Sequence, residues 1–196
     1  MILESRKWRL IGQGLALLVT TILILGFSGP ASYALQDDQP HTIYSSRTLA
    51  KMGLNGRFTV LRAEAELDRA VALHRDGHTS YWVPVQGYTD KEGAIHLFIL
   101  TDDIHTPPTA VAGGDQPVPF VGRLVRFDEA PHADAAQQVL ALALADPVGP
   151  DTYVLIEGDA PKAYRPMVPL VGGLGLVWFL ALVSFTRAWR RAPRHR

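Results

Sequence analysis

Two long apolar runs constrain this chain more than any other feature of its sequence. The first extends from Leu10 to Phe27 with Gln13 as its only strongly polar side chain, and the second extends from Val168 to Thr186 without a charged residue. A helix rises about 1.5 Å per residue, so each run is long enough to cross the roughly 30 Å hydrocarbon core of a bilayer. The sequence therefore predicts transmembrane helices at residues 10–28 and 167–186.

Basic residues border both predicted spans on the side that leads to a chain terminus. Residues 1–9 carry a net charge of +2, and residues 187–196 carry +5 with no acidic residue. Membrane helices retain flanking Lys and Arg on the cytoplasmic side. We therefore expect an integral protein of the cell membrane with its N-terminus and its basic tail in the cytoplasm. Residues 35–166 would then form an extracytoplasmic domain between the spans.

The first apolar run also has features of a cleaved signal peptide. A basic segment precedes it, and Ser32-Tyr33-Ala34 forms a small-x-small cleavage site before Leu35. Its 18 apolar residues exceed the roughly 7–15 of a usual signal-peptide core, which favours an uncleaved span. Pro30, after Gly29, is expected to end the helix. Both interpretations leave the domain outside the cytoplasm.

The middle of the chain is acidic, and the chain has no cysteine. Between the two terminal segments, 11 Lys and Arg residues are outnumbered by 18 Asp and Glu residues. Nucleic acid is therefore a poor partner, because duplex binding depends on Lys and Arg contacts with phosphates. The lack of cysteine excludes disulfides and cysteine zinc sites. The sequence also lacks the GxSxG, HExxH and GxxxxGK[ST] motifs, and we expect no cofactor.

The residues between the spans predict an α+β domain with a mixed or mainly antiparallel sheet of about five strands and two helices. The TDKEG segment is expected to join the second and third strands as a hairpin. Pro84 has no amide hydrogen, which predicts an edge position for its strand. The expected strands are residues 57–62, 80–88, 94–101, 118–127 and 152–157.

Two segments have the apolar periodicity of helices. Residues 64–76 form the first, with Gly77 as its C-terminal cap. The second begins near Asp134 and ends before Pro147. A weaker pattern at residues 43–52 suggests a further short helix. The resulting order, β-α-β-β-β-α-β, fits neither a ferredoxin-like fold, which lacks the extra strand, nor an OB-fold, which lacks the first helix. Each fold becomes possible if one predicted element is wrong.

The densest polar cluster in the domain is Thr101-Asp102-Asp103-Ile104-His105. Two carboxylates and an imidazole could bind a divalent ion or take part in acid–base chemistry. A strand-end turn is the preferred interpretation, because Asp side chains bond to nearby backbone in turns. Asp102, Asp103 and His105 are therefore candidate metal ligands, and no catalytic residue is predicted.

Other polar residues could form anion or metal sites, but an ordinary structural role is the preferred interpretation for each. Arg123 and Arg126 could recognise a carboxylate or phosphate, but a solvated strand face gives the same pattern. His74 and His78 lie four residues apart, yet the predicted helix ends between them, so a metal pair is not expected. His96 is expected to be a core histidine.

Small residues in the second span permit close packing against a partner helix, although membrane helices also tolerate glycine without such a partner. These residues are Gly172, Gly173 and Gly175. The basic tail could bind anionic lipid headgroups, or it could simply keep the C-terminus inside. Its first arginines are Arg187, Arg190 and Arg191.

These features favour a non-enzymatic membrane protein whose outer domain contacts other membrane-protein subunits, as an accessory or assembly subunit of a larger complex. The hairpin layout and the stretch from Gly122 to the C-terminus resemble the surfeit-locus family of cytochrome oxidase assembly factors. This resemblance implies a similar assembly role, and no residue role is carried over from it. Two alternatives remain: a metal-dependent hydrolase built on Asp102, Asp103 and His105, and a ligand-binding sensor that uses the 102–119 loop.

Overall fold

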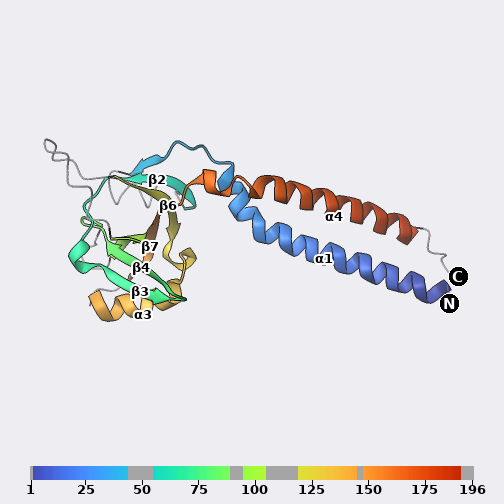
Figure 1. Ribbon diagram of the computed structural model, residues 1–196, viewed down its shortest axis with the longest axis horizontal. Coiled ribbons are helices and arrows are strands. Elements are labelled where there is room, and N and C mark those ends of the chain that lie inside the picture. Colours follow the sequence, from blue (N-terminus) through green and yellow to red (C-terminus); the bar gives the residue numbers. More distant parts are fainter. Residues whose placement is uncertain (1, 44–54, 89–94, 105–118, 145–147, 191–196) are drawn as a thin grey trace. The chain divides into compact units, whose positions relative to one another are not determined.

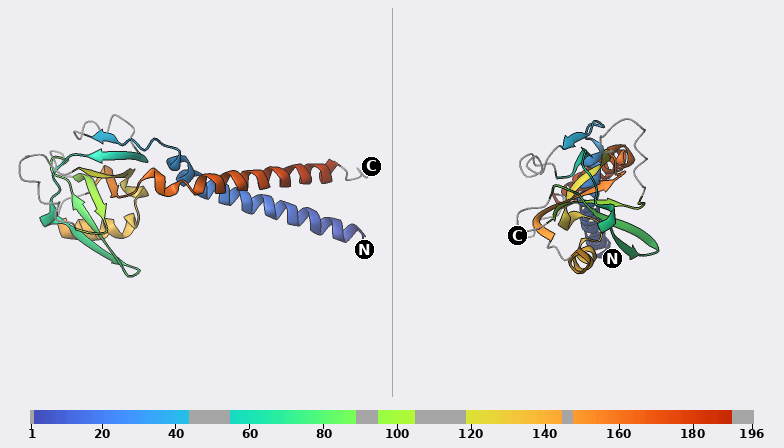
Figure 2. Two further views of the ribbon diagram at one scale, coloured as in Figure 1. Left: turned by 45° about the horizontal axis from the view of Figure 1, so that its top comes forward. Right: turned by 90° about the vertical axis from the view of Figure 1, so that its left-hand side faces the viewer.

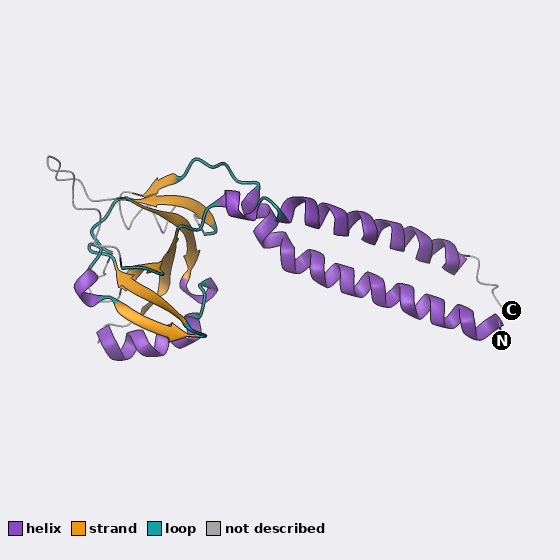
Figure 3. Ribbon diagram, in the orientation of Figure 1, coloured by secondary structure: helices purple, strands orange, loops and turns teal. Residues whose placement is uncertain are grey.

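The computed structural model (Figure 1) describes most of the chain and divides it into two compact units. One unit combines Met1–Leu35 with Pro161–Arg196, and the other comprises Gln36–Ala160. The first contains two long helices and the second a β-rich domain (Figure 3). The described residues are 2–43, 55–88, 95–104, 119–144 and 148–190.

The helical unit contains α1 (Ile2–Ala34) and α4 (Met167–Arg190). Both helices are long and apolar enough to cross a membrane, over Ile11–Ala34 and Pro161–Arg187. The expectation that Gly29-Pro30 ends the first helix was wrong, because α1 continues through Pro30. Pro30 lacks the amide hydrogen that would continue the helical hydrogen bonds. Burial of Ala31 and Tyr33 beyond the proline offsets this loss. Proline is tolerated in membrane helices when neighbouring elements hold the helix in this way.

α1 and α4 pack along seams in which less exposed residues recur every three or four positions. Alternating steps of four and three residues are typical of knobs-into-holes packing between helices. The seam on α1 is Gln13, Leu17, Thr20, Ile24, Phe27 and Ala31, and that on α4 is Met167, Val171, Leu174, Trp178, Ala181 and Phe185. Two side-chain hydrogen bonds of 2.9 Å join the helices, from Gln13 to Ser184 and from Trp178 to Thr21.

The domain contains a seven-stranded mixed sheet, which confirms the α+β class, whereas about five strands had been expected. The strand order is β1-β2-β6-β7-β5-β4-β3, and the β1–β2 and β5–β7 pairs are parallel. The strands are β1 (His41–Ile43), β2 (Arg57–Leu61), β3 (Val71–Arg75), β4 (His78–Pro84), β5 (Ile95–Thr101), β6 (Phe120–Arg126) and β7 (Val148–Glu157). The expected hairpin is confirmed as β4–β5.

The helix predicted at residues 64–76 is wrong, because this segment forms the short 3-10 helix η1 (Leu67–Arg69) and then β3. Asp76 and Gly77 both have positive φ angles, of 52° and 80°. Two such residues form the turn that suits the right-handed twist of a β-hairpin, and Asp-Gly is a preferred sequence for it. The turn pairs β3 with β4, and this hairpin prevails over the helical periodicity.

Pro84 does not place its strand at an edge of the sheet, so that prediction was also wrong. β4 lies between β5 and β3, and β3 is the edge strand. Pairing with β3 extends only as far as Val71 and Trp82, two residues before Pro84. The missing amide hydrogen therefore interrupts no hydrogen bond with β3.

The chain beyond β2 closes the sheet on itself. Ala65 forms an isolated antiparallel bridge with Val85, and the amides of Glu66 and Gln86 donate hydrogen bonds of 2.9 Å across the same segments. As a result β2, β6, β7, β5 and β4 follow one another around a ring. OB-folds are partly open five-stranded barrels, and the expected element order had failed to fit one only because of the predicted first helix, which is absent. The barrel interior holds Ile43, Leu61, Val83, Val85, Tyr88, Leu97, Ile99, Leu124 and Leu155.

A second core lies on the outer side of the sheet, where α3 (Ala133–Leu144) and the 3-10 helix η2 (Phe127–Glu129) cover it (Figure 2). Successive strand residues alternate between the two cores, so that Trp82 and Phe98 face α3 while Val83 and Leu97 face the interior. α3 confirms the helix expected after Asp134. Ile43, the first residue of the short helix expected at 43–52, instead ends β1. The remaining residues of that segment lie outside the described residues, as do the TDKEG segment, Pro147 and most of the 102–119 loop.

Candidate functional site

The predicted polar cluster begins where β5 ends. The Thr101 hydroxyl donates a 2.9 Å hydrogen bond to the Asp103 carbonyl and accepts a 3.2 Å bond from the Asp103 amide. The hydroxyl of Thr101 therefore stabilises the turn at the end of β5. The side chains of Asp102 and Asp103 in this turn are exposed. His105 lies outside the described residues. In the described part of the chain, no three His, Asp or Glu side chains are grouped to hold a metal ion.

A pocket of about 230 Å³ lies beside Asp102 on the α3 side of the sheet. Its apolar residues include Leu73, Leu100 and Ile156, from three different strands. Its polar residues are Arg75, His78, Ser80, Asp102, His132 and Glu157. Apolar walls with a few convergent polar groups are typical of small-molecule sites.

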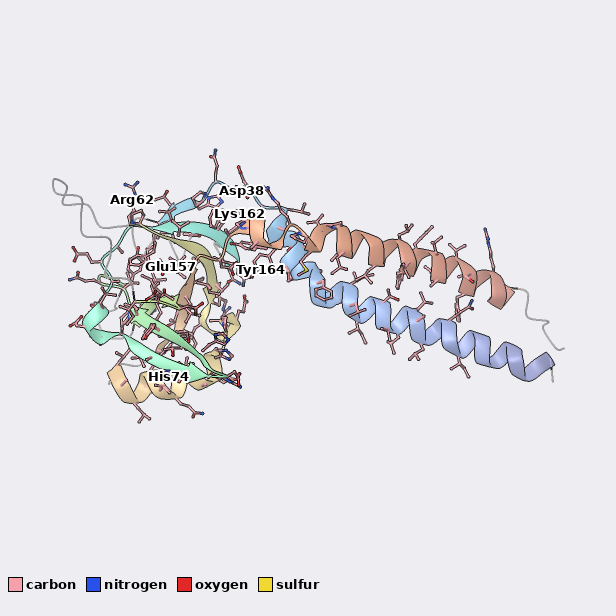
Figure 4. The ribbon with its side chains drawn as sticks, in the orientation of Figure 1. Asp38, Arg62, His74, Glu157, Lys162 and Tyr164 are labelled. Carbon is pink, nitrogen blue, oxygen red and sulfur yellow. The ribbon has the colours of Figure 1, made fainter. Side chains whose placement is uncertain are left out.

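The strand order separates the charges of this pocket. Asp102 and Glu157 lie at the carboxyl ends of β5 and β7, which are parallel neighbours and therefore end at the same edge of the sheet. Arg75 and His78 face each other across the β3–β4 turn. Since strands lie about 4.8 Å apart, β5 and β3 are separated by about 10 Å. The pocket is thus acidic on the β7–β5 side and basic on the β4–β3 side. Two of these strands can be found in Figure 4 by their labelled residues, Glu157 of β7 and His74 of β3.

His132 enters the pocket from the loop before α3. Its φ angle of 59° is unusual for a residue other than glycine, and its carbonyl accepts the Ala136 amide at 2.9 Å as the helix begins. The first amides of a helix carry a partial positive charge. The start of α3 therefore adds a second histidine and a weak positive field to the pocket.

The two arginines of β6 are engaged in separate ion pairs. Arg123 pairs with Asp159 at 2.9 Å, and the Asp159 side chain is only 9% exposed. Arg126 pairs with Asp128 at 3.3 Å, where both side chains are largely exposed. Residues three apart on a strand point to opposite faces of the sheet, so these arginines form neither a joint anion site nor one solvated face.

The histidines of the β3–β4 hairpin do not form a pair. His74 shares a 2.7 Å hydrogen bond with the Thr79 hydroxyl. His78 is the register partner of Arg75 and lines the pocket, whereas His74 points to the opposite face of the hairpin. His96 is half-buried, and its backbone amide donates to the Tyr88 carbonyl at 2.8 Å.

The glycines of α4 do not mediate its packing against α1. A Cβ atom added to any of the three would meet no atom within 4 Å. These glycines are Gly172, Gly173 and Gly175. Arg187 is exposed, Arg190 ends α4, and Arg191 lies outside the described residues.

Of the predicted metal candidates among the described residues, only Asp102 lies in the pocket, together with His78, which had been considered only as half of a metal pair. Sequence reasoning missed Arg75, His132 and Glu157, which are far apart in the chain. The Asp-Gly turn was the signal that could have revealed the β3–β4 hairpin and its two basic residues. Comparisons with protein families, curated proteins and solved structures found no match to this chain.

Proposed function

We propose that this chain is a non-enzymatic integral membrane protein whose extracytoplasmic domain contacts other membrane-protein subunits, as an accessory or assembly subunit of a larger complex. The observation that carries the proposal is the packing of α1 on α4. The Gln13–Ser184 and Trp178–Thr21 hydrogen bonds join the two helices along this contact. Large apolar side chains cover the remaining faces, among them Leu15, Leu18, Ile22, Leu176, Phe179 and Leu180.

Apolar faces of this size suit a bilayer, because lipid tails and partner helices both accept them. Hydrogen bonds between helices replace the water that polar seam residues would lose in hydrocarbon. The charge pattern supports the orientation, since the basic residues lie beyond the chain-terminal ends of the spans. Under this proposal the β-rich domain lies outside the cytoplasm and the basic tail lies inside.

The outward face of α4 is the surface that we assign to a partner helix. Gly172 and Gly173 are exposed, and neither contacts α1. Small residues let helix backbones approach closely in membranes, where apolar burial alone gives no preference for protein over lipid. The neighbouring Leu176 is 61% exposed and would pack beside such a helix.

Purification of the tagged full chain in mild detergent tests this proposal. We expect other membrane-protein subunits to co-purify at a fixed stoichiometry. Gly173→Ile should reduce their recovery at least about fivefold, which corresponds to roughly 1 kcal/mol. Gly26→Ile is the matched control, because Gly26 is an equally open glycine on α1. A chain that purifies alone, or loses its partners equally in both variants, would contradict the proposal.

Ligand binding by the domain is a second candidate function, which the pocket beside Asp102 favours. It corresponds to the sensor alternative, with the pocket in place of the 102–119 loop. The hydrolase alternative requires Asp102, Asp103 and His105 together and stays a prediction.

A further inference from the structure

We propose that the pocket beside Asp102 binds a small zwitterion of the amino-acid class. The ligand's ammonium would lie toward Asp102 and Glu157, and its carboxylate toward Arg75 and His78. This inference goes beyond the proposed contact with membrane subunits and does not depend on it.

The acidic side of the pocket offers the carboxylate of Asp102 to a cation. Leu100 of β5 is paired with Ile156 of β7, so the chain positions that follow them, with Asp102 and Glu157, lie at adjacent strand ends. Neither carboxylate has a hydrogen bond or ion pair with another described side chain. An ammonium carries three donors and can bond to the Asp102 carboxylate, while Glu157 adds a negative charge at the adjacent strand end.

The basic side of the pocket offers the guanidinium of Arg75, which forms only a long ion pair with the neighbouring Asp76. Arg75 Nε lies 3.7 Å from an Asp76 carboxylate oxygen, and these side chains are 53% and 83% exposed. Such an exposed pair contributes little binding energy. The guanidinium therefore retains donors for a ligand carboxylate, which it can hold through two parallel hydrogen bonds. His78 supplies a further ring nitrogen on this side, and His132 supplies another from the loop before α3.

The size and walls of the pocket restrict what lies between the two charged groups. Its volume of about 230 Å³ lies below the roughly 300–1,000 Å³ of most small-molecule sites, which favours a small ligand. Leu73, Leu100 and Ile156 form an apolar wall that suits a short hydrocarbon body. An amino acid has the required size, an apolar body and both charges.

The arrangement disfavours ligands of a single charge. A simple anion would lie near Asp102 and Glu157, and a simple cation would lie near Arg75. Like charges within one small site repel, and the repulsion is stronger where water is displaced. A zwitterion meets an opposite charge at each end, because the strand order keeps the acidic and basic residues apart.

Calorimetric titration of the full chain in detergent micelles tests the site, with each standard amino acid added singly. We expect at least one apolar amino acid, with leucine as the first probe, to bind saturably. The two half-ligands of leucine, isoamylamine and 4-methylpentanoate, should bind at least about tenfold more weakly, a loss of about 1.4 kcal/mol. Asp102→Asn should weaken leucine and isoamylamine but spare 4-methylpentanoate, and Arg75→Gln should have the reverse selectivity.

Asp103→Asn is the matched control, because it removes the same charge from the next residue, which does not line the pocket. Glu157→Gln provides a second acidic variant if Asp102→Asn fails to fold, as judged by its circular dichroism. The inference is overturned if no amino acid binds saturably, if a half-ligand binds as tightly as leucine, or if Asp103→Asn matches the loss in Asp102→Asn. Failure of these titrations leaves the co-purification result unaffected, so the two proposals can fail separately.

Discussion

Trp178 on α4 donates its indole N–H to the hydroxyl of Thr21 on α1 across 2.9 Å. The same hydroxyl donates to the Leu17 carbonyl at 2.8 Å, so its proton and one lone pair are both used. One small side chain thus joins its own helix backbone to the neighbouring helix. We expect this bond to stabilise the helix pair, because under the proposed membrane location the indole N–H has few other acceptors.

A double-mutant cycle with Thr21→Val and Trp178→Phe measures this contribution. Hydrogen bonds between membrane helices average about 0.6 kcal/mol and reach about 1.7 kcal/mol, and we expect a coupling energy within that range. Reversible unfolding in mixed detergent micelles is the measurement. Ser28→Ala is the control, because among the described residues the Ser28 hydroxyl bonds only to the Leu25 carbonyl of its own helix. A coupling near zero would mean that lipid or detergent replaces the bond without loss.

The N-terminal helix should remain attached to the protein. Tyr33 meets Tyr164 of the 3-10 helix η3 (Pro161–Tyr164) edge to face, with ring centroids 5.5 Å apart, and the side chain of Tyr33 is 3% exposed. The cleavage site before Leu35 therefore lies in a packed helix rather than in an accessible extended segment. Intact mass spectrometry of the purified chain should include the residues before Leu35. A mature chain that begins at Leu35 would refute this prediction.

The absence of cysteine allows a direct test of topology. Leu142 on α3 is 88% exposed, and Leu142→Cys introduces a single thiol into the domain. In intact cells this thiol should react with a membrane-impermeant maleimide, whereas a cysteine appended after Arg196 should react only after the cells are lysed. The opposite pattern would place the domain inside the cytoplasm.

Gly122 of β6 tolerates no side chain. A Cβ atom there would lie 1.9 Å from the carbonyl oxygen of Ile156, which is backbone and cannot move without displacing β7. Gly122→Ala should lower the free energy of unfolding by about 1–3 kcal/mol or more, since overpacking forces backbone shifts. Thermal unfolding followed by near-ultraviolet circular dichroism is the measurement. Ala72→Ser, on the exposed side of β3, should change the stability by less than about 0.5 kcal/mol.

Tyr88 should make the domain sensitive to alkaline pH. Its side chain is 4% exposed, its hydroxyl has no hydrogen-bond partner among the described residues, and burial raises its pKa above the ordinary value of 10.0. The folded state favours the neutral phenol, so this contribution to stability is complete below pH 10 and is lost as the pH rises through the folded-state pKa.

Tyr88→Phe removes both the titrating group and the unsatisfied hydroxyl. We expect a variant that is as stable as the parent chain or slightly more stable at pH 7, because no hydrogen bond is lost. Above pH 10 the variant should lose less stability than the parent chain in thermal unfolding experiments. Equal losses in the two proteins would show that other groups control alkaline unfolding.

The sequence alone determined the features that depend on local composition. Two apolar runs predicted α1 and α4, since a long stretch of apolar side chains has few other stable environments. Alternating strands and the stripe of α3 were also readable, because each element shows its buried face in its own periodicity. The 64–76 segment shows the limit of this approach, since its helical spacing competed with an Asp-Gly turn whose effect depends on pairing with β4.

Only the tertiary structure decided which residues meet. Arg75, His78, Asp102, His132 and Glu157 line one pocket because the strand order and the loop before α3 converge there. Nothing in the spacing of these residues along the chain predicts that arrangement. The same holds for Thr21 and Trp178, which are separated by 157 positions and meet across a helix seam. Local sequence encodes which face of an element is buried, whereas contacts between distant residues arise from the packing of whole elements against one another.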